Sequence, residues 1–572
     1  MYLKSYWRIL ATSLVSVCLL TAASISALGA QPNTAGNRAA SAPRIYTPIK
    51  GTGKLAGIVD LAKTPKLTPG AQTATSNIDL PRDPLAPAQR QAYEQSVRAN
   101  PQVKNPHPNT RSGDGRNPAF VGGGVIPLIV KNVDGLTSAQ AGGFVYPDTA
   151  IATDLSYVME GVNNAVAIYY ASSGALAYGP YSAQSFFAPV YNTGDIFFNP
   201  QMYYDVMRDR WMVSWLQKHA GAVYLDIAIS VSNSPTQPAP GGQYYIYQQG
   251  TNFEPSGGTP SDCNRMTMGM DYWGLYFTCQ NFRGSTFVGN TMIAFSKSTM
   301  LSGGGYFWWY YNDGLQMSGG GPAAVTSPAI EEGVQDAEFF LSTDAGLGGP
   351  SSNMGLCAWT NLSNITTTPP TLTCMNINLG LAYTDPLFAR QPSGPNVSPS
   401  FGPKQVYYKA GRLYLAQSTA LAGNHDGIYW AEVKPQLTTK AAHNPQWVNG
   451  AVVTQVAYYD FGSSVDVYTP TLMGTDENDI ILFYNLSGPT LNPSIGLTGR
   501  KATDADNTLG QGAYSWLLSG AHAHTTSSWG EYSSCAISLN SVTRGTIWCA
   551  AEYAGAVAAP GWNTRLFNFR VE

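Results

Sequence analysis

Cys535-Ala-Ile-Ser-Leu539 is followed by a polar turn, Asn540–Gly545, and by a returning run, Thr546-Ile-Trp-Cys549. Two short apolar runs around such a turn predict a β-hairpin. The cysteines lie at its open end, where a disulfide could join the two strands. This stretch therefore predicts β-structure that is stabilised locally.

Two other cysteine pairs bracket stretches of similar length: Cys263/Cys279 and Cys357/Cys374. An even number of cysteines in three close pairs predicts three local disulfides and an oxidising compartment. The alternative is six reduced, buried cysteines. A cysteine-based zinc site is not expected, because the chain has no C-x-x-C motif.

The first thirty residues predict a secretory signal peptide. Lys4 and Arg8 precede the apolar run Ile9–Ala23, and Ser26–Ala30 supplies small residues for cleavage. That run is too short to span a membrane stably, and no later segment reaches about 18 consecutive apolar residues. We expect a secreted or cell-surface protein without a transmembrane segment. A periplasmic or outer-membrane-associated location is the alternative.

Composition narrows the class of protein. Charged residues make up 12% of the chain, against roughly 25% in average globular proteins. With 44% hydrophobic residues the chain is not expected to be disordered. A Ser/Thr/Asn/Gly surface on a secreted β-protein explains the low charge, and so does an acidic habitat. The net charge of -3 argues against nucleic-acid binding.

The amino-acid composition and the apolar pattern of the chain change near residue 120. Residues 31–119 are rich in Pro, Ala, Asn, Gln and Thr, which predicts a linker or poorly ordered arm with a short helix around Pro87–Asn100. Residues 120–572 consist of short alternating runs between turn residues. The best strand is Ala222–Ser232, where odd-numbered apolar residues face one way. Further strands are predicted at Arg210–Leu216, Leu275–Cys279, Met292–Phe295, Glu338–Leu341, Gln405–Tyr408, Ile480–Tyr484 and Thr564–Arg570.

So many hairpins exceed one sandwich, and radial repetition removes most free sheet edges. At about 50–65 residues per four-stranded blade, the region would hold roughly seven blades. The predicted fold is an all-β, seven-bladed β-propeller over residues 120–572, with six or eight blades as neighbouring possibilities. A β-helix is disfavoured, because no short strict repeat occurs.

A series of motifs runs in order from about residue 144 to the C-terminus. They are Tyr146-Pro147-Asp148-Thr149, Gly161-Val-Asn-Asn164, Asn199-Pro200-Gln-Met-Tyr-Tyr-Asp205, Arg210-Trp211, Asn492-Pro493-Ser494-Ile495, Thr498-Gly499-Arg500, Trp529-Gly530-Glu531-Tyr532-Ser533 and Trp562-Asn563-Thr564-Arg565. Together they resemble a family of secreted bacterial β-propeller proteins that is related in fold to the sialidase-like propellers. The resemblance implies a propeller and an exported location, and it carries no established activity.

One motif departs from that family. The family usually reads Arg-Trp-Gly-Asp-Tyr-Ser, whereas here Ser528 replaces the arginine and Glu531 the aspartate. The charge pair expected within the motif is therefore predicted to be missing.

Seven residues of these motifs are candidates for ligand binding: Asp148, Asp205, Arg210, Arg500, Trp529, Glu531 and Tyr532. Aspartates in turns commonly accept backbone N–H bonds, so a structural role is the alternative for Asp148 and Asp205. Trp529 could stack on a carbohydrate or pack between blades. No catalytic residue is assigned.

Metal sites are weakly predicted. His522 and His524 are two ligands where zinc would want a third from the protein. The turns Asp476–Asp479 and Asp504–Asn507 are oxygen-rich and could hold calcium, but neither has EF-hand spacing. We expect no cofactor, with calcium as the alternative.

Familiar catalytic patterns are missing. No arginine lies between Arg116 and Arg208, the sialidase Asp-box starting at Ser342 lacks its tryptophan, and neither a Gly-x-Ser-x-Gly elbow nor a P-loop occurs. The leading prediction is an exported binding or surface-interaction protein that engages a glycan, polymer or protein. The alternative is an extracytoplasmic hydrolase or lyase with an acidic site at the propeller channel. A structural envelope component is a third interpretation. The oligomeric state stays open.

Overall fold

The computed structural model describes residues 43–67, 87–99, 127–143, 146–236, 241–251, 261–312, 323–344, 350–510, 515–538, 546–555 and 561–570. All of them belong to the second of two compact units into which the chain divides, residues 38–572. The predicted signal peptide, residues 1–30, lies outside the described residues. No helix in the described ranges is both long and apolar enough to cross a membrane.

Within these ranges the antiparallel pairings group the strands into seven four-stranded units, and short parallel bridges between their first strands join three of the units into one larger sheet. The first three are β5 (Ala150–Thr153), β6 (Tyr157–Val162), β7 (Ala165–Tyr170) and β8 (Leu176–Ser182); β9 (Ile196–Asp205), β10 (Arg210–His219), β11 (Ala222–Ser230) and β12 (Gln243–Gly250); and β13 (Asp262–Met270), β14 (Gly274–Arg283), β15 (Thr286–Ser296) and β16 (Tyr306–Asn312). The short helices α3 (Ala183–Phe186) and α4 (Lys297–Met300) follow β8 and β15.

The next three units are β17 (Val325–Glu331), β18 (Ala337–Thr343), β19 (Ser351–Thr360) and β20 (Thr371–Tyr383); β21 (Val406–Lys409), β22 (Arg412–Leu421), β23 (His425–Leu437) and β24 (Val448–Tyr459); and β25 (Asp466–Gly474), β26 (Ile480–Gly488), β27 (Leu491–Arg500) and β28 (Ser515–Leu518). The seventh contains β29 (Ser534–Ser538), β30 (Thr546–Tyr553) and β31 (Asn563–Arg570), together with β4 (Leu128–Thr137) from the start of the series. A 3₁₀ turn, Leu362–Asn364, follows β19.

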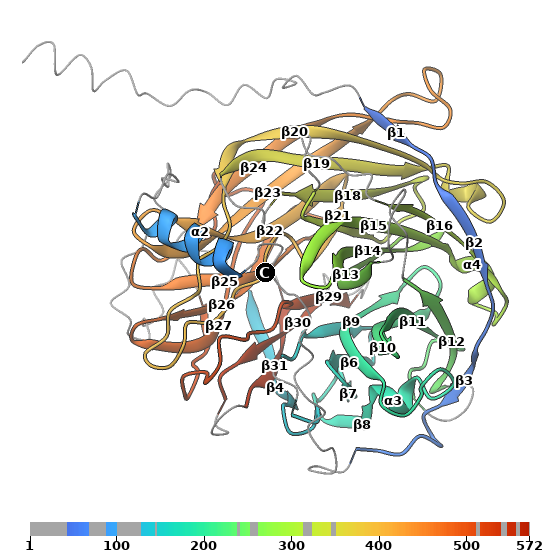
Figure 1. The fold of residues 1–572 in the computed structure, drawn as a ribbon, viewed down its shortest axis with the longest axis horizontal. Coiled ribbons are helices and arrows are strands. Elements are labelled where there is room, and N and C mark those ends of the chain that lie inside the picture. The colour runs from blue at the N-terminus through green and yellow to red at the C-terminus, as the bar shows by residue number, and fades with distance from the viewer. Residues whose placement is uncertain are drawn as a thin grey trace, which may run out of the picture. The chain divides into compact units, whose positions relative to one another are not determined.

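The first strands of the units form a closed series of contacts. β5 contacts β9, and the series continues through β13, β17, β21 and β25 to β29, which contacts β5 again. Figure 1 shows the units following one another in chain order, from cyan through green and orange to red. We call these seven first strands the ring. The eight strands predicted from the sequence all lie within observed strands, allowing for small differences at their ends.

Backbone pairing closes the series. β4 lies beside β31, in a register that runs from Leu128 opposite Arg570 to Thr137 opposite Asn563. Because the two strands come from opposite ends of the series, main-chain hydrogen bonds hold those ends together. An open series would leave both edges unpaired.

Left-handed residues explain several of the tight hairpins. Ala220 and Gly221, which join β10 to β11, have φ of 48° and 87°, and Ala410 and Gly411, which join β21 to β22, have φ of 49° and 78°. Two-residue hairpin turns whose twist matches that of the strands need positive φ at both positions. The glycine at the second position makes that conformation accessible.

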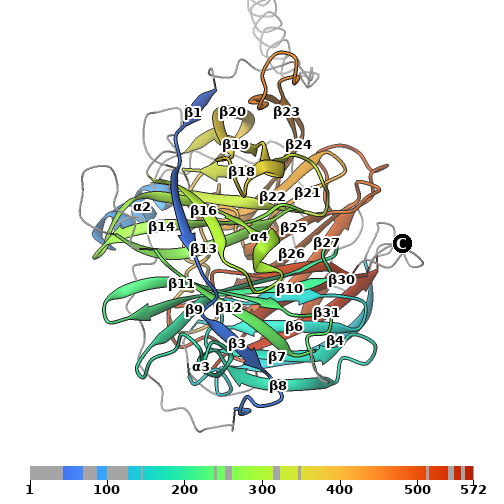
Figure 2. The ribbon, with the colours of Figure 1, turned by 90° about the vertical axis from the view of Figure 1, so that its right-hand side faces the viewer.

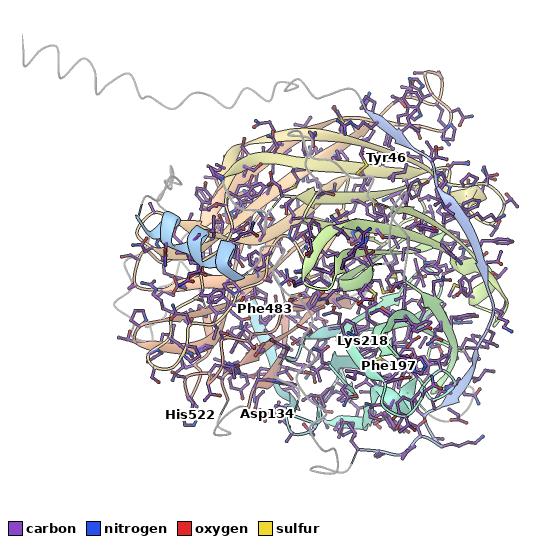
Figure 3. The ribbon with its side chains drawn as sticks, in the orientation of Figure 1. Tyr46, Asp134, Phe197, Lys218, Phe483 and His522 are labelled. Atoms are coloured by element: carbon purple, nitrogen blue, oxygen red, sulfur yellow. A yellow bond between two sulfur atoms is a disulfide. The ribbon has the colours of Figure 1, made fainter. Side chains whose placement is uncertain are left out.

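Both faces of the sheets are buried. In β11, Val223 and Ile227 belong to one apolar cluster, whereas Ala228 on the opposite face belongs to another. Even the polar residue Asp226 on that face is fully buried. Phe197 and Phe483, both labelled in Figure 3, are buried in the cores of different units. Each sheet thus packs against a neighbouring unit. The alternation of apolar and polar residues along a strand does not by itself reveal this packing.

The three predicted disulfides are confirmed: Cys263–Cys279, Cys357–Cys374 and Cys535–Cys549. They join β13 to β14, β19 to β20, and β29 to β30. Each therefore links adjacent strands of a single unit, as the local pairing predicted. Three formed disulfides fit an extracytoplasmic location.

The predicted linker or arm, residues 31–119, includes residues that the structure places in strands. Its described part contains three strands, β1 (Arg44–Tyr46), β2 (Ile49–Gly53) and β3 (Gly57–Asp60). They pair with the outer strands β20, β16 and β12 of three successive units, and Figure 2 shows them in blue along the edge of the sheets. An added edge strand takes its hydrogen bonds from the sheet and buries little of its own surface, so its sequence carries only a weak apolar pattern.

Two glycines let the added strand β2 lie close to aromatic side chains of β16. A Cβ atom on Gly51 would lie 2.0 Å from the Trp308 ring, and one on Gly53 would lie 2.0 Å from Tyr306.

The predicted helix around Pro87–Asn100 is confirmed as α2, Pro87–Ala99.

Candidate functional site

Four units begin with the same unusual backbone conformation. Asp148 directly before β5, Asn199 in β9, Arg265 in β13 and Thr469 in β25 have φ between 47° and 50°. Left-handed conformations are uncommon outside glycine and are concentrated at functional sites. In β13 and β25 a break in the strand register accompanies the residue. These four positive-φ residues place polar side chains near the starts of the first strands, at one end of the ring.

Asp148 joins three units at this end. Its Oδ1 accepts a hydrogen bond from the Glu531 N–H at 2.8 Å. Its Oδ2 accepts from Asn163 Nδ2 at 2.8 Å and from Asn199 Nδ2 at 3.1 Å. Because the carboxyl group is buried, these three N–H donors replace the water that an exposed carboxylate would bind.

The two asparagines extend the network. The Asn199 N–H donates to Asn163 Oδ1 at 2.8 Å, and Asn199 Oδ1 accepts from the Arg265 N–H at 2.9 Å. Asn163 lies in the turn between β6 and β7, so the network passes from the first unit through the second to the third.

Three charged side chains meet next to this network. Arg265 Nε lies 2.9 Å from Glu531 Oε1, and Lys404 Nζ lies 3.9 Å from Glu531 Oε2. All three side chains are buried, where ion pairs are screened less than at the surface. We call Asp148, Asn163, Asn199, Arg265, Lys404 and Glu531 the ring-end cluster.

This contact gives the glutamate of the tryptophan motif a charged partner from outside the motif. Glu531 lacks the arginine expected within its own motif, but it pairs with Arg265 from a different unit. The buried Nη1 atom of Arg265 donates no hydrogen bond to any described group, so its N–H groups are available to a ligand.

The aromatic candidates of the same motif are packed inside the protein. The Tyr532 hydroxyl donates to the Met266 carbonyl at 2.9 Å, and Lys404 Nζ lies 5.4 Å from the centre of the Tyr532 ring. Trp529 is 1% exposed, and its Nε1 donates to Asn485 Oδ1 at 3.4 Å. Tyr532 thus borders the ring-end cluster, whereas Trp529 is buried with its ring 6.3 Å from that of Tyr468.

Three other candidate residues, Asp205, Arg210 and Arg500, lie at strand ends next to turns. Asp205 Oδ1 accepts from the Met207 and Arg208 N–H groups at 3.1 Å each, and its other oxygen pairs with Lys297. Arg210 Nη1 donates to the Asp209 carbonyl at 2.8 Å.

Arg500 Nη2 donates to the Asp504 carbonyl at 2.7 Å. Among the described residues, Asp205, Arg210 and Arg500 make no hydrogen bond or ion pair with a member of the ring-end cluster. These side chains stabilise local turns.

Four members of the cluster were not among the candidates: Asn163, Asn199, Arg265 and Lys404. The two asparagines do stand in motifs of the family resemblance, next to turn residues, which was a usable indication. Arg265 and Lys404 carried none, since a single basic residue at a strand start is compatible with an exposed position.

The proposed metal-binding turns have other partners. Asp479 Oδ1 accepts from the Ala502 N–H at 2.8 Å, and Asp504 Oδ2 from the Lys501 N–H at 2.8 Å. His522 is exposed (Figure 3), whereas His524 is buried with its Nδ1 2.9 Å from the Thr526 carbonyl oxygen. In the part of the chain that the structure describes, no three His, Cys, Asp or Glu side chains come together as a metal site would require.

Comparison with known proteins yields distant likenesses only. No protein-family model matches the sequence, and no curated protein matches it. A polysaccharide lyase of family PL25, an ulvan lyase, is 12% identical over 79% of this chain and 95% of its own, with a TM-score of 0.35. A mutant sialidase of Trypanosoma rangeli is 9% identical over 70% of this chain and 56% of its own, with a TM-score of 0.33. An exo-β-1,3-galactanase from Phanerochaete chrysosporium is 10% identical over 63% and 78%, with a TM-score of 0.28.

Proposed function

We propose that the seven four-stranded units are the blades of a β-propeller and that the ring lines its axis. The closed series of contacts between first strands supports this arrangement. The pairing of β4 with β31 supports it as well, because propellers close by completing one blade with strands from both ends of the chain.

We further propose that the protein is an exported enzyme that cleaves a glycan, as a hydrolase or a lyase, at the ring-end cluster. One observation carries this proposal: Arg265, Lys404 and Glu531 come from three units far apart in the sequence and meet at a single point. Side chains that converge from separate loops with opposite charges are the usual basis of a catalytic site.

Each group has a chemically suitable role. Glu531 would transfer the proton, since a positioned carboxyl group can serve as general acid or base. Arg265 and Lys404 would bind an anionic group of the substrate, such as a uronate carboxylate, and Arg265 Nη1 is the N–H donor available for it. The preferred substrate is therefore an acidic polysaccharide outside the cell.

The test compares the wild-type protein with Glu531→Gln on acidic and neutral polysaccharides. Reducing ends without ultraviolet absorbance of an unsaturated sugar would identify a hydrolase, and reducing ends with that absorbance a lyase. Glu531→Gln keeps the shape of the side chain and should reduce cleavage by roughly 10²-fold or more. Asp506→Asn, at a side chain that is 78% exposed, is the matched control and should retain full activity. An active Glu531→Gln variant would remove Glu531 from the reaction.

A binding protein without catalysis is the second candidate. The Asp148 carboxyl group already accepts three hydrogen bonds from the protein itself, which suits a structural group better than a reacting one. Saturable binding of a glycan, polymer or protein with no product, equal in wild type and Glu531→Gln, would favour this candidate.

A further inference from the structure

Helix α2 contains a buried arginine among side chains that are mostly exposed over residues 89–95. Arg90 is 4% exposed, whereas Gln89 and Gln91 on either side are exposed. Among the described side chains of α2, that of Arg90 is the one that is buried. A guanidinium group leaves water only where other groups replace its hydration, so its surroundings should form a binding site.

Those surroundings match a guanidinium group closely. Arg90 Nη2 donates to the Pro386 carbonyl, and Nη1 lies 3.9 Å from Asp385 Oδ2. The Arg90 Cζ atom lies 4.7 Å from the centre of the Phe401 ring and 5.3 Å from that of Phe388. A carbonyl that accepts an N–H group, a carboxylate nearby and aromatic rings beside them are the partners that a guanidinium group prefers. We call Asp385, Pro386, Phe388 and Phe401 the guanidinium pocket.

Contacts that do not involve α2 hold the loop of this pocket in place. The Thr384 N–H donates to Thr419 Oγ1 at 2.9 Å, and the Leu387 N–H donates to Asp426 Oδ1 at 2.7 Å. Thr419 and Asp426 belong to β22 and β23 of the fifth unit. The pocket should therefore keep its shape without the helix, and the helix is the removable partner.

The guanidinium pocket borders the ring-end cluster. The Arg265 Cζ atom lies 5.3 Å from the centre of the same Phe401 ring that Arg90 contacts, and Phe401 is 1% exposed. Lys404 follows three residues later in the chain. Helix α2, drawn in blue in Figure 1, thus docks on the segment that leads directly into the cluster.

We propose that α2 is an intrachain ligand: Arg90 fills the guanidinium pocket, and the docked helix covers the ring-end cluster, which is accessible when Arg90 leaves. The pocket would then accept a guanidinium group from elsewhere, such as an arginine side chain of a partner. The docking stands on the contacts of Arg90, whereas the gain of activity on release rests on the proposed function.

Amide hydrogen exchange of full-length variants tests the docking. Arg90→Ala should raise the exchange rates of the α2 amides roughly tenfold or more, because a charged donor loses its buried acceptors. Arg90→Lys keeps the charge without the planar donor and should fall between. Gln91→Ala, one position away, should match the wild-type rates. Equal rates in Arg90→Ala and wild type would overturn the docking.

Chemical rescue tests what the pocket binds. Methylguanidinium should slow α2 exchange in Arg90→Ala toward the wild-type rates, whereas methylammonium at the same concentration should not. A failure of methylguanidinium to protect the helix would refute the guanidinium pocket. Tyr93→Phe, which loses the 2.7 Å bond from the tyrosine hydroxyl to the Asp385 carbonyl, gives a second, milder variant.

Hydroxyl-radical footprinting tests the covering without relying on activity. Oxidation of Phe401 and Tyr532 should rise severalfold in Arg90→Ala, while Tyr181, buried in another unit, stays protected and reports an intact fold. Unchanged oxidation of both would show that α2 does not cover the cluster. If cleavage is measurable, its rate should rise in parallel. If Phe401 and Tyr532 become exposed but no variant cleaves a glycan, the proposed enzymatic function is refuted. The proposal that α2 covers the ring-end cluster would still stand.

Discussion

At the ring end, the Glu531 carboxylate lies 2.9 Å from Arg265 Nε and 3.9 Å from Lys404 Nζ. Inside the first unit, the equally buried Glu160 accepts hydrogen bonds only from neutral groups. They are the Leu136 N–H at 3.0 Å, the Tyr169 hydroxyl at 2.9 Å and the Thr564 hydroxyl. One buried carboxyl group faces two cations, and the other faces none among the described residues.

Burial without a neighbouring cation shifts the pKa of a carboxyl group. Burial raises the pKa of Glu160 from 4.5 to about 7, and its hydrogen bonds offset that rise only in part. Burial likewise raises the pKa of Asp226, whose Oδ1 accepts from Gln248 at 3.0 Å. Two cations thus lie beside one buried carboxyl group at the end of the ring, whereas the buried carboxyl groups of Glu160 and Asp226 favour a neutral form because burial raises their pKa.

Removing one cation from the cluster should have the largest effect. Arg265→Met leaves Glu531 buried beside Lys404 alone and should lower the free energy of unfolding by about 3–5 kcal/mol. Urea denaturation measures the loss. The double variant Arg265→Met with Glu531→Gln removes both charges and should lose less than the single variant. A double variant as unstable as the sum of the two single ones would show that the pair is not coupled.

The pH dependence of Glu160 comes next in size. Between pH 4.5 and about 7 the folded protein retains a proton on Glu160 that the unfolded chain releases. The free energy of unfolding should therefore fall as pH rises through that window, by about 3 kcal/mol from this group. Glu160→Gln should lack this component in denaturation at pH 4 to 8. The exposed Glu477→Gln serves as control and should follow the wild-type curve.

A matched pair of Asp→Asn variants sharpens the comparison. In Asp148→Asn one N–H donor must face another, because both carboxyl oxygens accept from N–H groups, and the loss should be about 2 kcal/mol at pH 6. Asp226→Asn retains an acceptor for Gln248 and should change stability by less than about 0.5 kcal/mol. Thermal unfolding measures the stability of both variants, and similar losses would contradict the difference in hydrogen bonding between the two sites.

An exposed ion pair gives the smallest expected effect. Asp506 is 78% exposed and lies 3.9 Å from Arg500 Nη2. Asp506→Asn should change the free energy of unfolding by less than about 0.5 kcal/mol, because solvent screens such pairs. A larger loss would mean that burial is not what separates the ring-end cluster from other ion pairs of this chain.

Local features of the fold could be predicted from the sequence. Alternating apolar residues marked the strands, and the three cysteine pairs joined neighbouring strands because each pair bracketed its own hairpin. The edge strands β1–β3 escaped prediction, since they pair with sheets far along the chain and expose much of their own surface. In the tryptophan motif a missing charge pair was expected, and its partner proved to be Arg265, 266 positions away.

The amino-acid sequence by itself determined the strands, the turns and the disulfides, because these depend on residues close together in the chain. The tertiary structure alone decided which charges meet. Arg265, Lys404 and Glu531 become neighbours only when the first strands of distant units contact one another. Burial then sets the outcome, since a carboxyl group that leaves water keeps its charge beside a cation and favours its proton where it has none.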